Sequence, residues 1–249
     1  MKNIINLLII GIIQGLTEFL PISSSGHIVL FGSLVQMDNL LLVSVVAHIG
    51  TLFAVILCYK DRLKQLVLHP KNPTNINLIL ATIPTVIIVV LFNKFFESRF
   101  SINGLVWGFL FSAIMLAIAD FKKTNSKHFN KTSSIIEGII QGGAVIPGIS
   151  RSGATLVGGI LMGIDKKECL DFSFLMSIPI IIASAVYEGA KLFTCQITLN
   201  WLEIFVVMIS SFVFGIISIK LMLKFVKNNR LIYFSFYLII LSLVLLFVF

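Results

Sequence analysis

The sequence predicts an all-α integral membrane protein built from two inverted-topology repeats, each consisting of a re-entrant helical hairpin and three transmembrane helices. Three observations predict this fold. Hydrophobic residues make up 57% of the 249-residue chain and charged residues only 12%, whereas soluble domains carry about a quarter charged residues. Six apolar stretches are long enough to cross a bilayer. The sequence Gly-Ile-Ile-Gln-Gly occurs at residues 11–15 and again at 138–142, as a duplicated unit would give.

Each copy of this motif lies in a segment that is interrupted by proline. Residues 4–34 contain the break Pro21-Ile-Ser-Ser-Ser-Gly26, and residues 133–162 contain Pro147-Gly-Ile-Ser-Arg-Ser-Gly153. At least one apolar arm beside each break is well below the roughly 17 residues that a crossing needs. We therefore expect re-entrant hairpins or half-helices rather than pairs of complete crossings. The first segment is expected to remain in the mature chain, because Gln14 and Glu18 interrupt its apolar run and no small-residue cleavage site follows.

Six other segments are expected to cross the membrane as complete helices, and three of them follow each hairpin. They are residues 40–57, 76–92, 102–119, 172–190, 201–219 and 231–249. The polar stretches between them are loop-sized, and no linker or low-complexity tract is visible. Residues 1–249 are therefore expected to form a single polytopic membrane domain, with repeat one at about 1–120 and repeat two at about 133–249.

The expected topology divides the basic residues unequally. A re-entrant hairpin returns to its own side and three crossings then change sides, so the two hairpins would enter from opposite faces, as in many transporters. Arg151 is intramembrane, and the side that holds the termini has few basic residues: Lys2, Lys94, Arg99 and Lys191. All other lysines and arginines fall on the opposite side, which the positive-inside rule places in the cytoplasm. Both termini and the mouth of the first hairpin are thus expected on the outer face.

Charge and cysteine content argue against a nucleic-acid-binding protein and against disulfides or zinc sites. The formal net charge of +8 comes from basic residues at the ends of apolar spans, which is typical of membrane orientation, so we expect no nucleic-acid partner. The three cysteines, Cys58, Cys169 and Cys195, are odd in number and lack metal-ligand spacing. They are interpreted as packing residues rather than as disulfides or zinc ligands.

The first hairpin presents a carboxylate inside an apolar segment. Gln14 and Glu18 are four residues apart and share one helix face, along with small glycines that let another backbone approach. Pro21 then stops this helix. Polar and ionisable groups are costly in a membrane and are functional by default. Glu18 is therefore a candidate catalytic or metal-binding residue, with Gln14 beside it.

The serines and histidine after Pro21 add a nucleophile, a base and a phosphate site. Ser23, Ser24 or Ser25 can cap the following helix, whose N-terminal N–H groups and dipole would face an anion near the midplane. If Ser24 and His27 lie in the first turn, their spacing would put hydroxyl and imidazole side by side, as a nucleophile and its base require.

The second hairpin repeats this architecture but supplies a cation. Ser150, Arg151 and Ser152 follow Pro147-Gly148, and no glutamate occupies the place of Glu18. An arginine fork binds two phosphate oxygens and stabilises charge in phosphoryl transfer. A buried arginine needs an anionic partner, which is either Glu18 in a structural ion pair or an anionic ligand.

Packing is the competing interpretation for the smaller residues. Serines and glycines in membrane helices often mediate close approach, and this interpretation is favoured for Ser23 or Ser25 alone. No primary role is assigned to His48 or Glu188. Glu137 and Glu203 lie near the starts of apolar segments and are expected at the membrane interface.

The two hairpin sequences together resemble the undecaprenyl-diphosphate phosphatase family of the bacitracin-resistance type. The similarity rests on Gln14-Gly-Leu-Thr-Glu18, its continuation Pro21-Ile-Ser-Ser-Ser-Gly-His27, and Pro147-Gly-Ile-Ser-Arg-Ser-Gly-Ala-Thr155. It covers essentially the whole chain. Gln14 is the permitted alternative to a first glutamate in the family pattern, so Glu18 would bind a metal with a neutral oxygen donor beside it rather than with a second carboxylate.

This resemblance implies a bacterial plasma-membrane enzyme that hydrolyses undecaprenyl pyrophosphate to undecaprenyl phosphate and inorganic phosphate. Such an enzyme recycles the lipid carrier of peptidoglycan synthesis and confers bacitracin resistance, usually with a divalent cation, Mg²⁺ or Ca²⁺. Ser24 then corresponds to the nucleophile, and Glu18, His27 and Arg151 to the other catalytic residues, with Glu18 as the metal ligand. The expected substrate-binding residues are Gln14, Ser23, Ser25, Gly148, Ser150, Ser152 and Thr155.

Three alternatives stay open at the level of sequence. Water could attack directly instead of Ser24. A transporter or lipid flippase would use inverted repeats without bond cleavage, and a non-catalytic binding protein would need only Arg151 and the helix dipoles. The oligomeric state is also open, a homodimer included.

Overall fold

The computed structural model describes residues 2–37, 40–97, 102–124, 127–192 and 200–248. Eleven α-helices and no strands occur in these ranges. The all-α class is as the sequence predicts, but residues 60–68 form a helix in a polar stretch that was expected to be a loop. The helices are α1 (Lys2–Phe19), α2 (Ser24–Leu34), α3 (Leu40–Cys58), α4 (Lys60–Leu68), α5 (Pro73–Glu97), α6 (Ile102–Phe121), α7 (Lys131–Gly143), α8 (Arg151–Leu161), α9 (Lys166–Leu192), α10 (Trp201–Lys227) and α11 (Ile232–Val248).

Five of the described helices, α3, α5, α6, α9 and α10, are long and apolar enough to cross a membrane. They coincide with five of the six expected crossings but extend further at one or both ends, because polar residues continue the helices. For example, α10 starts at Trp201 as expected but continues past the apolar stretch to Lys227. The sixth, α11, is a shorter apolar helix of 17 residues. Arg99, Cys195 and Phe249 lie outside the described residues.

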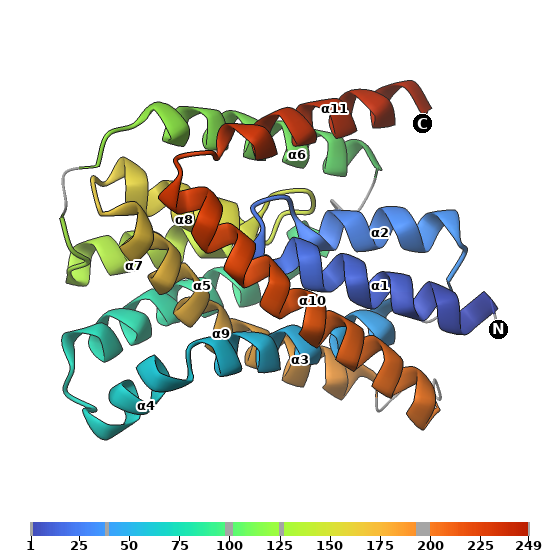
Figure 1. Cartoon of the computed structure of the whole chain (residues 1–249), viewed down its shortest axis with the longest axis horizontal. Helices are drawn as coiled ribbons and strands as arrows, with labels where there is room; N and C mark the ends of the chain where they lie inside the picture. The colour runs from blue at the N-terminus through green and yellow to red at the C-terminus, as the bar shows by residue number, and fades with distance from the viewer. Residues whose placement is uncertain (1, 38–39, 98–101, 125–126, 193–199, 249) are drawn as a thin grey trace.

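Both segments that carry the repeated motif are broken where the prolines predict. The first helix, α1, ends at Phe19, and α2 starts at Ser24 with Ser23 as its N-cap. In the second segment α7 ends at Gly143, and α8 starts at Arg151 with Ser150 as its N-cap. Figure 1 shows α1 entering from the end of the molecule that holds both termini, whereas α7 enters from the opposite end, where α4 and the α10–α11 loop lie.

Each broken segment packs against a helix from the other half of the chain. The first helix, α1, runs along α10, and α7 runs along α5. Close approach at both contacts depends on glycine: a side chain at Gly15 would collide with backbone atoms of Ser211 and Gly215, and one at Gly138 with the carbonyl oxygen of Ala81. Small residues at such contacts let helices pack by dispersion in lipid, where there is no hydrophobic driving force between them. Because each broken segment packs against the other half of the chain, the two breaks lie close together.

Candidate active site

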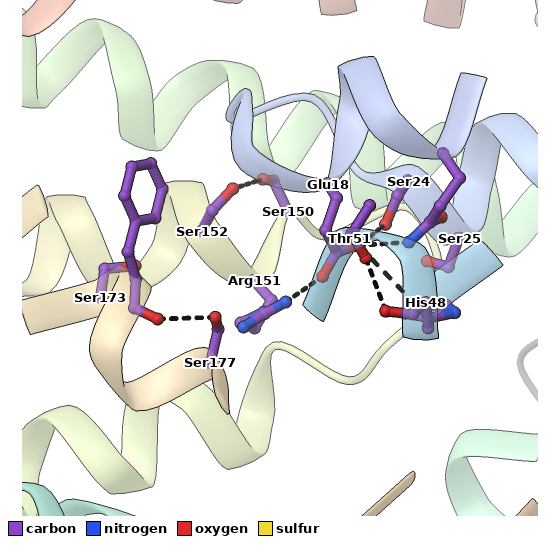
Figure 2. Close-up of polar contacts among 12 residues, drawn as sticks. Glu18, Ser24, Ser25, His48, Thr51, Ser150, Arg151, Ser152, Ser173 and Ser177 are labelled. Carbon is purple, nitrogen blue, oxygen red and sulfur yellow. Dashed lines mark hydrogen bonds and ion pairs between the residues drawn. The ribbon is translucent and has the colours of Figure 1, made fainter. Parts of the chain in front are cut away.

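Three helix ends meet where the two broken segments approach each other. Glu18 lies in the last turn of α1, Ser24 is the first residue of α2, and Arg151 is the first residue of α8. Figure 2 shows Ser24 and Arg151 on either side of the Glu18 carboxylate. The N-termini of α2 and α8 carry the positive ends of their dipoles. The region thus combines one carboxylate, one guanidinium, one hydroxyl and two helix N-termini.

The Glu18 carboxylate is the centre of the polar contacts. Its Oε1 forms an ion pair with the Arg151 guanidinium. Its Oε2 accepts hydrogen bonds from Ser24 Oγ at 2.6 Å and from Gln14 Nε2 at 3.0 Å, and His48 Nε2 lies 3.7 Å from the same oxygen. The Glu18 side chain is only 3% exposed, whereas that of Arg151 is 18% exposed. The guanidinium is therefore the side of the pair that an approaching anion can reach.

Local sequence explains why these side chains converge. The four-residue spacing puts Gln14 and Glu18 on one face of α1, as expected, and their side chains are hydrogen-bonded. Ser23 has a φ of +68°, which costs a residue with a side chain about 1–3 kcal/mol and often marks a functional turn. This turn reverses the chain so that Ser24 lies beside Glu18, and the Ser23 side chain caps α2 by accepting from the Gly26 N–H at 3.4 Å.

The polar residues of the second break form hydrogen bonds within α8 and to neighbouring segments. Ser150 caps α8 by accepting from the Gly153 N–H at 3.1 Å, and Ser152 Oγ donates to the Leu20 carbonyl at 3.1 Å. Gly148 has a φ of +83°, a conformation that favours glycine. Thr155 Oγ1 is 2.6 Å from Ser173 Oγ on α9. These contacts hold Arg151 against Glu18.

Ser25 is the remaining expected substrate-binding residue. Its hydroxyl is 3.4 Å from that of Ser23, and its side chain is partly exposed. Figure 2 places it near Ser24 and His48.

His27 does not lie beside the Ser24 hydroxyl as its spacing suggested. Its Nδ1 is 2.8 Å from the Ser23 carbonyl oxygen, so Nδ1 carries the proton and donates. Its Nε2 then accepts from the Tyr237 hydroxyl at 2.6 Å, and the two rings are stacked. The difference arises because Ser24 turns back toward α1, while His27 faces α11. In this arrangement Glu18, and not His27, is the base in contact with Ser24.

Sequence reasoning missed two residues of this region, His48 and Tyr237, and did not foresee the burial of Glu137 on α7. His48 was given no primary role although it lies beside Glu18, and Tyr237 carried no signal in the sequence. The expectation of an interfacial Glu137 is wrong, because this side chain is completely buried. Neither of its carboxylate oxygens has a hydrogen-bond partner within the described ranges, since α5 and α8 cover this face of α7.

The donor set allows a divalent cation only with help from a ligand. Gln14 Oε1 is buried without a hydrogen-bond partner in the described part of the chain, and it belongs to the residue that contacts Glu18. No cluster of three His, Cys, Asp or Glu side chains suited to a metal occurs among the residues that the structure covers. Mg²⁺ is usually held by one or two carboxylates and by substrate phosphates rather than by a protein cage. Glu18 and Gln14 fit such a shared site.

This combination of groups suits phosphoryl transfer. A guanidinium and helix N-termini stabilise the charge on phosphate oxygens, and a hydroxyl in contact with a carboxylate can lose its proton as it attacks. A structural ion pair alone would not require Ser24 in contact with Glu18. The geometry therefore points to a site that binds an anion and can also do chemistry.

Comparison with known proteins gives the same result. Residues 7–244 match the family described as Bacitracin resistance protein BacA. The chain is 35% identical to an undecaprenyl-diphosphatase from Borrelia recurrentis, with 96% of each chain covered. It is 33% identical to one from Carboxydothermus hydrogenoformans, over 96% of this chain and 95% of the relative. It is 36% identical to undecaprenyl-diphosphatase 4 from Bacillus thuringiensis, over 94% and 93%. This multi-pass membrane protein therefore belongs to the bacitracin resistance protein BacA family.

Proposed function

We propose that this protein is an undecaprenyl-diphosphatase, which hydrolyses undecaprenyl pyrophosphate to undecaprenyl phosphate and inorganic phosphate. The observation that carries the proposal is the contact of Glu18 with both Ser24 and Arg151. Membership of the BacA family and the names of the relatives support it. The reaction recycles the lipid carrier for peptidoglycan synthesis and thereby confers bacitracin resistance.

Substrate binding uses the cation that is already in place. The terminal phosphate competes with Glu18 for the Arg151 guanidinium, which forms two parallel hydrogen bonds to phosphate oxygens. N–H groups in the first turns of α2 and α8 add donors that are fixed before the substrate arrives. The prenyl chain lies among the apolar helices. The Glu18 carboxylate is buried, which strengthens its charge interactions.

Catalysis starts from the hydrogen bond between Ser24 and Glu18. As Ser24 Oγ attacks the terminal phosphorus, its proton passes to Glu18, the anhydride P–O bond breaks, and undecaprenyl phosphate leaves. Water then hydrolyses the phosphoserine. Direct attack by water, with Glu18 as the base, is the other route. Trapping a phosphoserine at Ser24 supports the first, and full activity of Ser24→Ala excludes it.

We also propose that a divalent cation, Mg²⁺ or Ca²⁺, assists this reaction. Glu18 and Gln14 would hold it together with substrate oxygens, and it would supply Lewis-acid stabilisation of the phosphate charge. Phosphate release measured with and without EDTA tests this part of the proposal.

The topology completes the proposal. The two halves form inverted-topology repeats of one membrane domain, and the site opens on the outer face together with both termini. The opposite entry of α1 and α7 (Figure 1) and the few basic residues near the termini support this orientation. Labelling of single cysteines at the termini in intact cells tests it, and a C-terminus protected from outside reagents would overturn it.

Reconstituted vesicles distinguish hydrolysis from lipid transport without hydrolysis. Vesicles that contain undecaprenyl pyrophosphate are assayed for released phosphate and for transfer of labelled lipid, with wild type beside Ser24→Ala and Glu18→Gln. We expect phosphate release by wild type and a loss of about 10²–10³-fold in Glu18→Gln. Transfer of intact undecaprenyl pyrophosphate without phosphate release would show that the protein is a transporter and not a hydrolase.

A further inference from the structure

A cavity of about 970 Å³ lies at the ends of three long helices. It is formed by the end of α6 and the residues after it, the start of α9 and the end of α10. In Figure 1 these elements meet at the end of the molecule opposite the termini. No residue of the Glu18 site lines this cavity. Its five lysines are Lys122, Lys123, Lys166, Lys167 and Lys227.

The charge of this lysine cavity is not balanced by its own acidic residues. Asp120 accepts a hydrogen bond from the Leu231 N–H at 2.9 Å, and Asp165 accepts from the N–H groups of Lys167 and Glu168 at the start of α9. Both aspartates are thus engaged with the backbone. None of the ion pairs found in the described part of the chain includes a lysine. Lys166 Nζ donates to Asn229 Oδ1 at 2.9 Å, and this amide oxygen carries no charge. Five lysines against two aspartates leave the cavity with an excess of positive charge, which favours an external anion.

The cavity also has an apolar side that a soluble anion would not need. Phe121, Leu223 and Val226 contribute to its lining, and Phe121 is 81% exposed. Since α6 and α10 are long and apolar enough to cross a membrane, their ends lie where the hydrocarbon gives way to headgroups. Lysine stems can lie along such apolar surface while the ammonium groups reach the headgroup phosphates.

We propose that the lysine cavity binds a phosphate-bearing anion at the membrane surface, and that this anion is the headgroup of an anionic phospholipid. The lysines contact the phosphate, and the acyl chains leave along Phe121 and Leu223. The cavity volume lies within the range of about 300–1,000 Å³ that is typical of ligand sites. Basic pockets beside transmembrane helices bind acidic headgroups for the same electrostatic reason. This site is separate from the hydrolytic one and does not depend on it.

The experiment measures lipid retention by the full-length protein in detergent, using native mass spectrometry. Phosphatidylglycerol, phosphatidylcholine and inorganic phosphate are offered separately and in competition. The cavity variant replaces all five lysines of the lysine cavity by glutamine. The control variant removes five exposed lysines that do not line the cavity: Lys60, Lys64, Lys71, Lys131 and Lys220. Size-exclusion chromatography establishes that both variants remain folded.

We expect wild type and the control variant to prefer phosphatidylglycerol over phosphatidylcholine. In the cavity variant this preference should fall by at least about tenfold, because one lysine near an acidic headgroup contributes roughly fivefold. Binding of inorganic phosphate that displaces the lipid would keep the phosphate chemistry but assign the site to a soluble anion. Equal retention of both lipids by wild type, or equal loss in both variants, would overturn the proposal, because the lysines would then serve membrane orientation alone.

Discussion

The ion pair between Arg151 and Glu18 allows its structural and catalytic contributions to be separated by a double-mutant cycle. Arg151→Gln leaves a carboxylate that is 3% exposed without its cation, and breaking a buried pair from one side costs about 3–5 kcal/mol. We expect the lower end, about 3 kcal/mol, because Ser24 and Gln14 continue to donate to the carboxylate. Glu18→Gln should cost less, about 1.5 kcal/mol, because Arg151 is partly exposed.

The double variant Glu18→Gln/Arg151→Gln should be hardly less stable than Glu18→Gln alone, because no buried charge is left unpaired. The coupling free energy is then about 2–3 kcal/mol, well above the roughly 0.5 kcal/mol expected of independent sites. The assay is denaturant unfolding of the purified protein in detergent, with exposed Lys131→Gln as the control and phosphate release measured in parallel. The double variant should recover stability but not activity. Additive losses of stability would refute the reasoning, and recovered activity would make the pair purely structural.

Three further predictions concern helix packing, the pH dependence of stability and the stacked rings of His27 and Tyr237. Gly138→Ala should destabilise the protein by about 1–3 kcal/mol, because its side chain would collide with the α5 backbone, whereas Gly143→Ala has open space and should be tolerated in the same unfolding assay. His128 has a raised pKa because it is hydrogen-bonded to the Glu168 carboxylate and attracted by its charge. Its contribution to stability is present below the usual pKa of about 6.5 and is lost as pH rises through the raised value; thermal unfolding of His128→Gln should lack this pH-dependent loss. Tyr237→Phe keeps the ring stacked on His27 but removes the hydrogen bond to His27 Nε2. If His27 contributes to catalysis, phosphate release should fall by about 2- to 10-fold; an unchanged rate would show that His27 and Tyr237 do not contribute.

Local sequence was sufficient for the long helices, the breaks and the central carboxylate, but not for α4, which forms in a polar stretch that was expected to be a loop. Pro21 follows the end of α1, as expected of a residue that lacks a backbone donor. The second break begins earlier than its proline, because α7 ends at Gly143, and Pro84 and Pro179 lie inside α5 and α9. The contact between Gln14 and Glu18 follows from helix geometry alone. The alternative partner proposed for Arg151, Glu18 in an ion pair, is present. Each of these features depends on residues close in sequence or on the cost of an unpaired charge.

Contacts between distant segments were not predictable in the same way. His48 reaches Glu18 because α3 packs beside α1. His27 contacts Tyr237 on α11, more than 200 residues further along the chain. Glu137 looked interfacial because hydropathy does not reveal that α5 and α8 cover it. Such contacts depend on which helices become neighbours, and spacing within one segment carries no information about that.

The most direct test of the central claim is phosphate release from undecaprenyl pyrophosphate by purified wild type, Glu18→Gln, Arg151→Ala and the Lys131→Gln control. If both broken segments build one site, Glu18→Gln and Arg151→Ala should each lose about 10²–10³-fold in turnover, as when a charge-stabilising group is removed from an active site. The Lys131→Gln control should keep wild-type activity. If Arg151→Ala hydrolyses the substrate as fast as wild type, the second segment does not belong to the hydrolytic site and the account is contradicted.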